Sequence, residues 1–353
     1  MTRVIRLAGA VLACTLAVSA GAPSPARSAE TYTVRVGVLS IIVDAPFHIA
    51  DKKGYFKEEG IDVKFVTFAS SGNMVVPLTT DQLDVGGGAP TAGIYNGFVK
   101  GLNVKVVADK GTDAKGYGFN PLMVRKELVT SGKFKTPKDL RGMTIAVNQP
   151  GSVSASSLFE LLKKYGLTLA QVRRENLDYP EHVAAFSNGK VDAGITAEPS
   201  AADAERRGVA VRIMGNDAWY PNQQLSVVIY SNDFITKHRD VAQRFMRAYL
   251  KGARFYYGAL KDGHFAGPNA NEVIAILTAT TNIKDPQTYR EIRPSALNPD
   301  GRVNLVSMRK DLTYFRDQGI VEGTVRVEDI VDESFVKQAA KELGPYRPPG
   351  RSR

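Results

Sequence analysis

The side chains most often used for catalysis are present in this chain, but their spacing matches no catalytic set. Residues 151–155 (GSVSA) lack the final glycine of the nucleophile elbow G-x-S-x-G. Residues 86–91 (GGGAPT) lack the last glycine of the dinucleotide motif G-x-G-x-x-G, and no G-x-x-x-x-G-K-[ST] phosphate loop occurs. The four histidines do not have metal-binding spacing: His48, His182, His238 and His264. We therefore expect a protein that is not an enzyme and that uses no cofactor or metal.

Composition excludes several other classes of protein. The chain has 353 residues and a formal net charge of +10, from 46 Lys and Arg against 36 Asp and Glu. This length suggests two domains. The single cysteine, Cys14, excludes an internal disulfide framework and a cysteine-rich metal cluster. The basic balance suggests nucleic acid, but we find no basic stripe with interleaved aromatic residues, so we expect no such partner.

The first residues indicate export. Arg3 and Arg6 precede an uncharged apolar run over residues 7–21, which is too short to span a membrane and is followed by Pro23. We predict a signal peptide over residues 1–26, with cleavage after Ser28 as a close alternative. A lipid anchor at Cys14 is a weaker alternative, because the apolar run continues past it. The expected location is the periplasm.

Apolar runs alternate with helical patterns from residue 33 onward, which predicts βαβ units, largely parallel sheets and an α/β fold. Residues 117–124 and 225–231 resemble connections between two lobes. Residues Asp84–Gly86 and Asp192–Gly194 are similar and each precede a proline-started helix, which favours related lobes, although ordinary α/β turns give the same pattern. The predicted parts are a first lobe (31–118 plus 229–344), a second lobe (119–228) and a disordered basic tail (345–353).

One segment of the sequence resembles a known family. Residues 54–66 (GYFKEEGIDVKFV) resemble the G-[YF]-F-x-x-x-G-[IL]-x-V segment of periplasmic solute-binding proteins of ABC transporters, in the sulfonate, nitrate and taurine group and the thiamine-pyrimidine group. Residues 70–72, 83–88, 140–147 and 191–193 follow in the family's order and spacing. The resemblance covers roughly residues 34–335. It implies two α/β lobes joined by two crossover strands, the type II periplasmic-binding-protein fold, closing on a ligand.

An α/β sheet places its binding crevice at the carboxyl ends of its strands, which directs attention to four loops that precede helices. We define the first loop as residues 43–46, the second as 70–73, the third as 87–91 and the fourth as 151–154. Free amides at helix starts suit sulfonate, carboxylate or phosphate oxygens, although each serine there also fits a plain helix cap. The expected ligand contacts in these loops are Val43, Asp44, Ser70, Ser71, Gly72, Gly88, Ala89, Thr91, Gly151, Ser152 and Val153.

Four further side chains have open roles. Asp44 and Glu198 could bind an amine or a ring N–H, or could be solvated loop acids. Trp219, the only tryptophan, could wall an organic ligand or pack beneath the hinge. Asn120, on the first connection, is another candidate contact.

These features predict the substrate-binding component of an ABC importer, a monomer that delivers a small organic anion or zwitterion to a membrane permease and its ATPase. A sulfonate, a taurine-like zwitterion or a pyrimidine or other aromatic compound would fit. The alternatives are a pyrimidine synthase on the same fold and a ligand sensor for a receptor. The synthases of the family carry a cysteine-rich segment, whereas this chain has only Cys14.

Overall fold

Two five-stranded β-sheets organise the computed structural model, which describes residues 1–2 and 31–349. The predicted signal peptide, with Cys14, lies outside the described residues except for its first two. The end of the predicted tail, residues 350–353, also lies outside them. Within the described ranges, no helix has both the length and the apolar character needed to cross a membrane.

The first sheet has the strand order β2-β1-β3-β10-β4. Strand β1 pairs in parallel with β2 and β3, whereas β10 runs antiparallel to β3 and β4. Side chains from α1 and β4 pack so closely on β3 that a Cβ at Gly87 would lie 2.6 Å from Phe47 and 2.9 Å from Lys110. The strands are β1 (Tyr32–Val38), β2 (Ile61–Thr67), β3 (Val85–Gly88), β4 (Val104–Thr112) and β10 (Gln224–Ser231).

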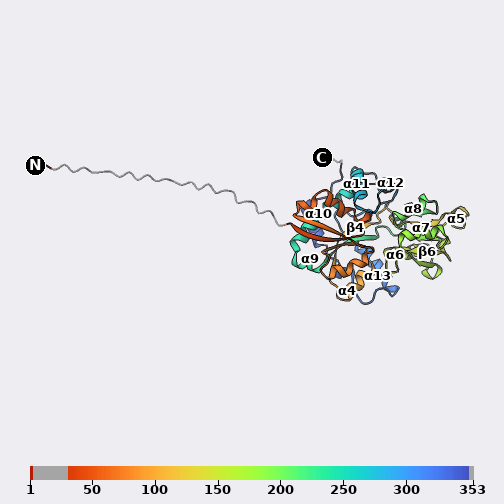
Figure 1. Cartoon of the computed structure of the whole chain (residues 1–353). Helices are drawn as coiled ribbons and strands as arrows, with labels where there is room; N and C mark the ends of the chain where they lie inside the picture. The colour runs from red at the N-terminus through yellow and green to blue at the C-terminus, as the bar shows by residue number, and fades with distance from the viewer. Residues whose placement is uncertain (3–30, 350–353) are drawn as a thin grey trace. The chain divides into compact units, whose positions relative to one another are not determined.

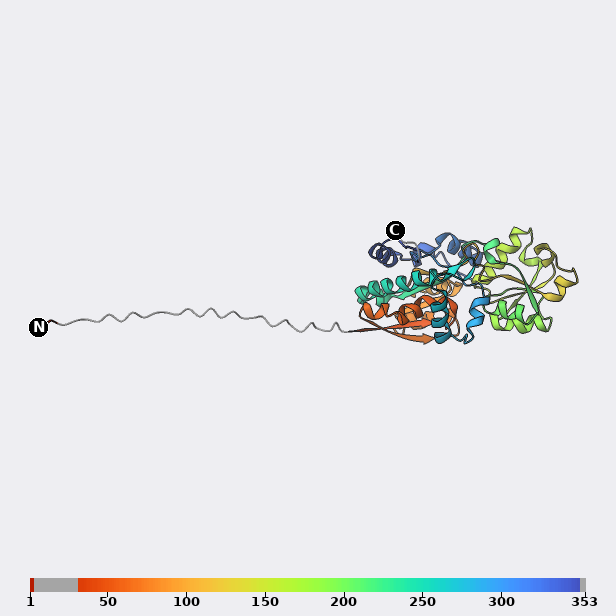
Figure 2. The same ribbon diagram turned by 90° about the horizontal axis from the view of Figure 1, so that it is seen from above.

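The second sheet repeats this order position by position, as β7-β6-β8-β5-β9. Strand β6 is parallel to β7 and β8, and β5 is the antiparallel strand between β8 and β9. Figures 1 and 2 show the two sheets in separate lobes, the second coloured yellow to green. Its strands are β5 (Leu122–Arg125), β6 (Thr144–Val147), β7 (Arg173–Asn176), β8 (Ala193–Ile195) and β9 (Ala210–Met214).

The similar Asp-x-Gly segments occupy the same place in the two sheets. Asp84 precedes β3; its carboxylate accepts the backbone N–H of Arg35 at 2.7 Å, and its own N–H donates to the Arg35 carbonyl. Asp192 precedes β8 and makes the same two bonds with Thr144, the first at 2.9 Å. Each carboxylate also binds a guanidinium, that of Arg35 or of Arg125. The two segments therefore fix equivalent strand junctions in the two lobes.

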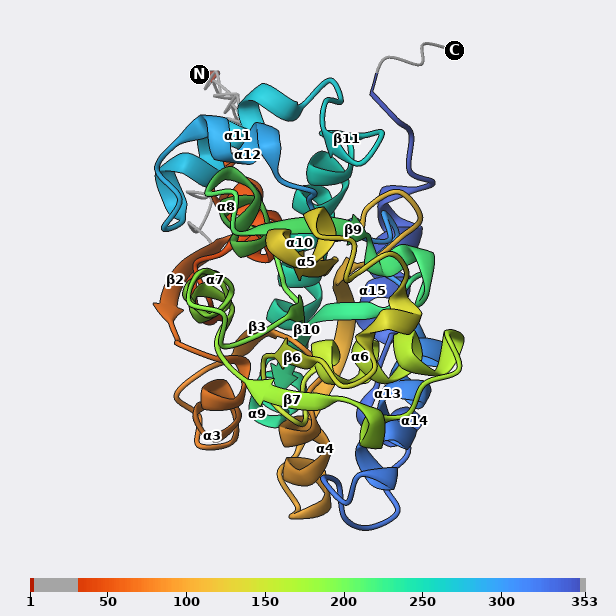
Figure 3. The same cartoon turned by 90° about the vertical axis from the view of Figure 1, so that its right-hand side faces the viewer.

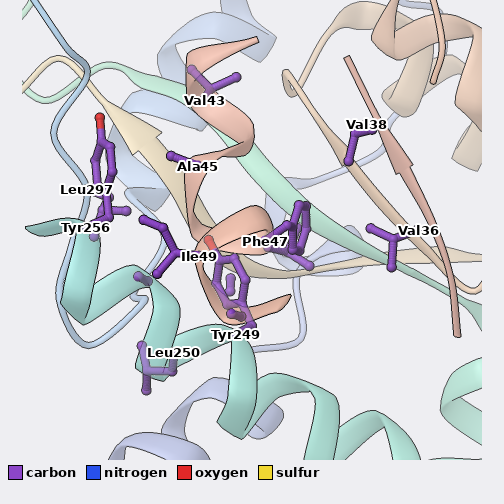
Figure 4. Close-up of a cluster of buried hydrophobic side chains, with 14 of the residues drawn as sticks. Val36, Val38, Val43, Ala45, Phe47, Ile49, Tyr249, Leu250, Tyr256 and Leu297 are labelled. Atoms are coloured by element: carbon purple, nitrogen blue, oxygen red, sulfur yellow. The ribbon is translucent and has the colours of Figure 1, made fainter. Parts of the chain in front are cut away.

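The first lobe has the larger helical layer, built around α10. This helix buries one face at helical spacing, including Phe245, Tyr249 and Tyr256, and packs on α1 and α15. The ring centroids of Phe47 and Tyr249 lie 5.1 Å apart, and Figure 4 shows this contact within the core. The helices are α1 (Ala45–Lys52), α2 (Tyr55–Glu58), α3 (Val75–Thr79), α4 (Ala92–Val99), α9 (Asn232–Lys237), α10 (Arg239–Tyr257), α11 (Ala270–Thr280), α12 (Pro286–Glu291), α13 (Leu305–Asp317), α14 (Val327–Ile330) and α15 (Ser334–Leu343), with a small hairpin of β11 (Leu260–Lys261) and β12 (His264–Phe265).

The second lobe carries fewer helices, and one of them packs against the first lobe. Figure 3 views this lobe from its outer side. Helix α6 packs on α13, where the rings of Phe159 and Tyr314 lie 5.3 Å apart. The lobes are therefore joined by side-chain packing as well as by the chain. The helices are α5 (Lys126–Thr130), α6 (Val153–Lys164), α7 (Tyr179–Ser187) and α8 (Ser200–Arg206).

The connections between the lobes differ from the predicted ones. Residues 225–231, expected to link the lobes, lie in β10, and every residue of that strand is buried. An apolar run of this kind fits an interior strand better than a solvent-exposed link. By sheet membership, we propose a first lobe of residues 31–112 and 224–349, a second lobe of 122–214, and connections at 113–121 and 215–223. Tyr346, in the predicted tail, packs edge-on against Tyr257.

Candidate functional site

Three of the four predicted loops lie side by side. In the first lobe, the Ser71 hydroxyl of the second loop accepts the N–H of Ala89 in the third loop at 3.0 Å. Across the lobes, Ala92 at the start of α4 donates its N–H to the carbonyl of Gly151 in the fourth loop, also at 3.0 Å. A Cβ at Gly151 would lie 2.6 Å from that of Ala92, so this approach requires glycine. The carboxyl ends of β3 and β6 thus meet at one place.

The hydroxyl groups in these loops divide into two kinds. Ser152 caps α6: its hydroxyl accepts the N–H of Ala155 at 3.3 Å and donates to the carbonyl of Gln149 at 2.6 Å. Ser70 and Thr91 stand before helical turns, but neither side chain makes the capping bond. Ser152 therefore has the helix-capping role, while Ser70 and Thr91 keep hydroxyls that can bind a ligand.

Asp44 in the first loop is compensated by a lysine that the sequence did not point to. The carboxylate is fully buried, and its Oδ1 lies 2.6 Å from Lys110 Nζ. Its Oδ2 accepts the backbone N–H groups of Leu39 and Ile41, at 2.8 and 3.3 Å. Lys110 also donates to the carbonyl of Val43. Burial lowers the pKa of Lys110, and the charge of Asp44 opposes this shift. Both oxygens of Asp44 thus already accept hydrogen bonds, and the carboxylate is fully buried.

Glu198 is compensated in the same way in the second lobe. Its Oε1 lies 2.5 Å from Arg212 Nη2 and accepts the backbone N–H of Arg293 from the first lobe at 3.1 Å. Its Oε2 accepts the N–H of Ala202. Burial raises the pKa of Glu198, and Arg212 opposes this shift. Both acids expected to attract a cationic ligand are thus neutralised by buried or half-buried cations.

Trp219 packs within the protein. Its indole N–H donates to the carbonyl of Ser157 in α6 at 3.0 Å, and the ring is buried in the core shared by α6 and α13. The neighbouring Tyr220 donates its hydroxyl to Asp311 of α13 at 2.8 Å. These two aromatic residues therefore anchor the second connection, which agrees with the packing role that the sequence left open for Trp219.

Asn120 is the connection residue that keeps an open polar atom. It is 2% exposed and follows Phe119, whose N–H donates to the buried carboxylate of Asp113; that carboxylate also accepts the side-chain amide of Asn216. Burial raises the pKa of Asp113 to about 7. Among the described residues, Asn120 Oδ1 has no hydrogen-bond donor.

Apolar side chains from both lobes surround this region. Val43 from the first lobe belongs to one continuous buried cluster with Phe119, Val153 and Ala197. Tyr179, the first residue of α7, packs against this cluster. Burial raises the pKa of Tyr179 to about 12, so the hydroxyl remains a donor at neutral pH. The sequence analysis missed Tyr179, although the Pro180 that follows marks a helix start as Pro46 does.

Helix starts give the site its electrostatic character. Helices α4 and α6 begin in opposite lobes, at the Ala92–Gly151 contact. Amides in the first turn of a helix have no intrahelical acceptor and carry a partial positive charge. With Asp44 and Glu198 neutralised, that charge is not offset by a free carboxylate from the predicted set. The arrangement favours an anionic group with an apolar body.

A separate groove of about 860 Å³ lies between α7 and α8, next to Ile283 and Thr288. None of the four loops lines it, and its charged residues pair locally, with Arg206 and Arg207 both on Asp203. In the described part of the chain, no three His, Cys, Asp or Glu side chains gather as a metal site requires. We therefore keep the loop region as the candidate site.

Comparison with known sequences adds independent findings. The sequence profile of the family described as NMT1/THI5 like matches residues 43–259. A protein of Bacillus subtilis (strain 168) named for aliphatic sulfonates binding is 25% identical over 319 residues, covering 88% of each chain. The taurine-binding periplasmic protein of Escherichia coli (strain K12) is 26% identical over 316 residues, covering 88% of this chain and 89% of that one.

Comparison with solved structures identifies the fold. The periplasmic nitrate-binding protein NrtA of Synechocystis PCC 6803 has a TM-score of 0.71 at 14% identity, covering 89% of each chain. The periplasmic aliphatic sulphonate binding protein SsuA of Escherichia coli has a TM-score of 0.67 at 18% identity, covering 85% of this chain and 92% of that one. The two-lobed fold is that of periplasmic binding proteins.

Proposed function

The chain belongs to the NMT1/THI5-like family, and we propose that it is the solute-binding component of an ABC importer that captures a small organic anion between its lobes. Relatives named for sulfonate and taurine binding match it over 88% of its length, which supports a binding role without catalysis. The proposed partners are a membrane permease and its ATPase, and the proposed form is an exported, periplasmic monomer.

The observation that carries the anion assignment is the compensation of both site acids. A ligand ammonium group would need an uncompensated carboxylate, but Asp44 is held by Lys110 and Glu198 by Arg212. The backbone amides at the helix starts and the hydroxyls of Ser70 and Thr91 can donate hydrogen bonds, which suits a ligand acceptor such as a sulfonate oxygen. The sequence analysis also allowed a zwitterion, but these two acids no longer support an ammonium group on the ligand.

Contacts across the lobes support capture by closure. The Ala92–Gly151 and Arg293–Glu198 bonds join the lobes on two sides of the candidate site. The first joins two backbone groups and the second joins the Arg293 N–H to the Glu198 carboxylate, and both form only when the lobes approach, as in hinge closure around a ligand. A ligand that fits between the loops would stabilise this closed arrangement by its differential affinity for it.

A thermal-shift screen tests the proposal. The panel contains alkanesulfonates, taurine, nitrate, aromatic carboxylates, aminopyrimidines and alkylamines, each at millimolar concentration. Organic sulfonates should raise Tm because they bind the folded state only, and simple alkylamines should not. An affinity between micromolar and nanomolar would correspond to about −8 to −12 kcal/mol. Folded protein that responds to no compound, or only to amines, would contradict the proposal.

A further inference from the structure

Asn120 combines two properties that do not occur together elsewhere in the predicted site: its side chain is buried, and its carbonyl oxygen is unpartnered among the described residues. A buried acceptor without a donor is unfavourable, so its persistence beside a ligand site points to a donor on the ligand. We propose that Asn120 accepts a hydrogen bond from an uncharged hydroxyl of the bound anion, selecting hydroxylated organic anions over unsubstituted ones. This inference rests on the proposed function.

The neighbouring carboxylate of Asp113 favours one orientation of the amide. Asp113 accepts the N–H of Phe119 at 2.7 Å and the side-chain amide of Asn216 at 2.6 Å, so it lies beside the Asn120 backbone. Burial raises the pKa of Asp113 and the amide group of Asn120 opposes this shift, whereas its carbonyl oxygen turned toward this carboxylate would be repulsive. Oδ1 therefore belongs on the side away from Asp113, where it has no donor among the described residues.

The backbone places Asn120 just before β5, opposite the end of β8. Residues 119 and 121 continue the β5–β8 pairing, because their carbonyls accept the N–H groups of Glu198 and Thr196 at the end of β8. Side chains alternate across a strand, so Asn120 shares a face with Leu122 and Val124. That face packs against α6, in the cluster that contains Leu158. This alternation places Asn120 on the α6 side of the sheet at the edge where β8 ends, and α6 begins at the fourth loop.

The surrounding charges favour a hydroxyl over an ammonium group. Asp113 already accepts the N–H of Phe119 and the side-chain amide of Asn216, and burial raises its pKa, which weakens it as a counter-ion. Asp44 and Glu198 have their own cations. A ligand ammonium would enter this region without a free carboxylate from these three acids, whereas a hydroxyl needs only one acceptor.

The first test varies the ligand on the wild-type protein. Isothermal titration calorimetry compares ethanesulfonate, 2-hydroxyethanesulfonate, 2-methoxyethanesulfonate and taurine. The hydroxyl compound should bind about tenfold or more tightly than ethanesulfonate, in line with one added buried hydrogen bond. The methoxy compound, which adds an oxygen but no donor, should show no gain, and taurine should bind more weakly than the hydroxyl compound. Equal affinities for the hydroxyl compound and ethanesulfonate would overturn the inference.

The second test varies the protein, with a matched control. Asn120→Ala should reduce the preference for the hydroxyl over ethanesulfonate to less than about twofold, because only the hydroxyl compound loses a partner. Asn216→Ala removes a side-chain amide donor of Asp113 and should change both affinities by one common factor, keeping the preference. A preference that survives Asn120→Ala, or that disappears equally in Asn216→Ala, would give Asn120 a structural role only.

The outcomes separate this inference from the proposed function. If all the sulfonates bind without discrimination, the importer proposal stands and the role of Asn120 is rejected. If none of the four compounds binds to protein that is folded by circular dichroism, both are rejected. If Asn120→Ala does not fold, the wild-type ligand series alone decides, because it needs no substitution.

Discussion

Two groups of buried carboxylates differ in the groups that stabilise their negative charge. At the candidate site, Asp44 and Glu198 each face a cation, Lys110 or Arg212. Around the connections, by contrast, Asp109, Asp113 and Asp311 are buried among neutral donors: backbone amides, side-chain amides and hydroxyls. Ion pairing occupies both site carboxylates and makes them unavailable to ligand cations. Burial without compensation makes the connection acids sensitive to pH.

The largest effect is expected for Lys110→Met, which removes the cation that pairs with Asp44. The substitution leaves Asp44 buried without its cation and should cost about 3–5 kcal/mol of unfolding free energy, the usual cost of unpairing a buried ion pair. Urea unfolding measures it. The double variant Asp44→Asn, Lys110→Met is the control and should recover part of the loss. A single variant as stable as wild type would show that the pair is not charged.

The carboxylates without a cation partner should make the stability of the protein depend on pH. Burial raises the pKa of Asp109 to about 6, and those of Asp113 and Asp311 to about 7. Between about pH 4 and the raised pKa of each group, the folded protein keeps a proton that the unfolded chain has released. Each of these carboxylates therefore lowers the free energy of unfolding of the protein as pH rises. Buried histidines act in the opposite sense, since burial lowers the pKa of His182 to about 4.

A difference experiment isolates one carboxylate from these opposing effects. Relative to Asp311→Asn, wild-type protein should lose unfolding free energy as pH rises from about 4 to 7, by about 1.4 kcal/mol for each pKa unit of the shift. Urea unfolding at five pH values gives the difference curve. A flat curve would mean that Ser156, Tyr220 and Gln223 keep Asp311 ionised throughout.

Glu198→Gln sharpens the assignment of the site acids. It frees Arg212 from its buried partner, so the affinity for a sulfonate should stay within a factor of about five and move toward tighter binding. Calorimetry measures it. The control is Glu205→Gln, because Glu205 binds the same guanidinium at 3.0 Å but is more exposed. A large loss of sulfonate affinity in Glu198→Gln alone would return Glu198 to direct ligand contact.

Trp219→Phe should have the smallest effect on binding. The indole N–H bonds to Ser157, so the substitution should cost about 1 kcal/mol of stability while ligand Kd changes less than about threefold. Urea unfolding and calorimetry provide the two values. If instead Kd rises tenfold at unchanged stability, the ring contacts the ligand.

The sequence predicted those helices and strands whose patterns are set by residues close together in the chain. β-Branched runs located β1, β2 and β6, and prolines near helix starts located α1 and α8, because strand and helix periodicity are local properties. Strand β7 (RREN) was missed because an exposed edge strand has no apolar pattern. Residues 225–231 were placed in a connection because the sequence does not show that β10 enters between β3 and β4.

The site was predicted in outline, but its charge balance was not. The second, third and fourth loops were correctly expected to begin helices, and the structure brings them together through Ser71–Ala89 and Ala92–Gly151. The compensation of Asp44 depends on Lys110, 66 residues away in β4. No local pattern reveals such a pairing, so the sequence left both acids open as partners of a ligand amine or ring N–H or as solvated loop acids.

The central claim is that the site selects negative charge because its own acids are compensated. Calorimetry with two ions of similar size and opposite charge, ethanesulfonate and ethylammonium, tests it most directly. We predict saturable one-to-one binding of ethanesulfonate to the wild-type protein and no measurable binding of ethylammonium under the same conditions. Binding of ethylammonium as tight as that of ethanesulfonate, or tighter, would contradict the account.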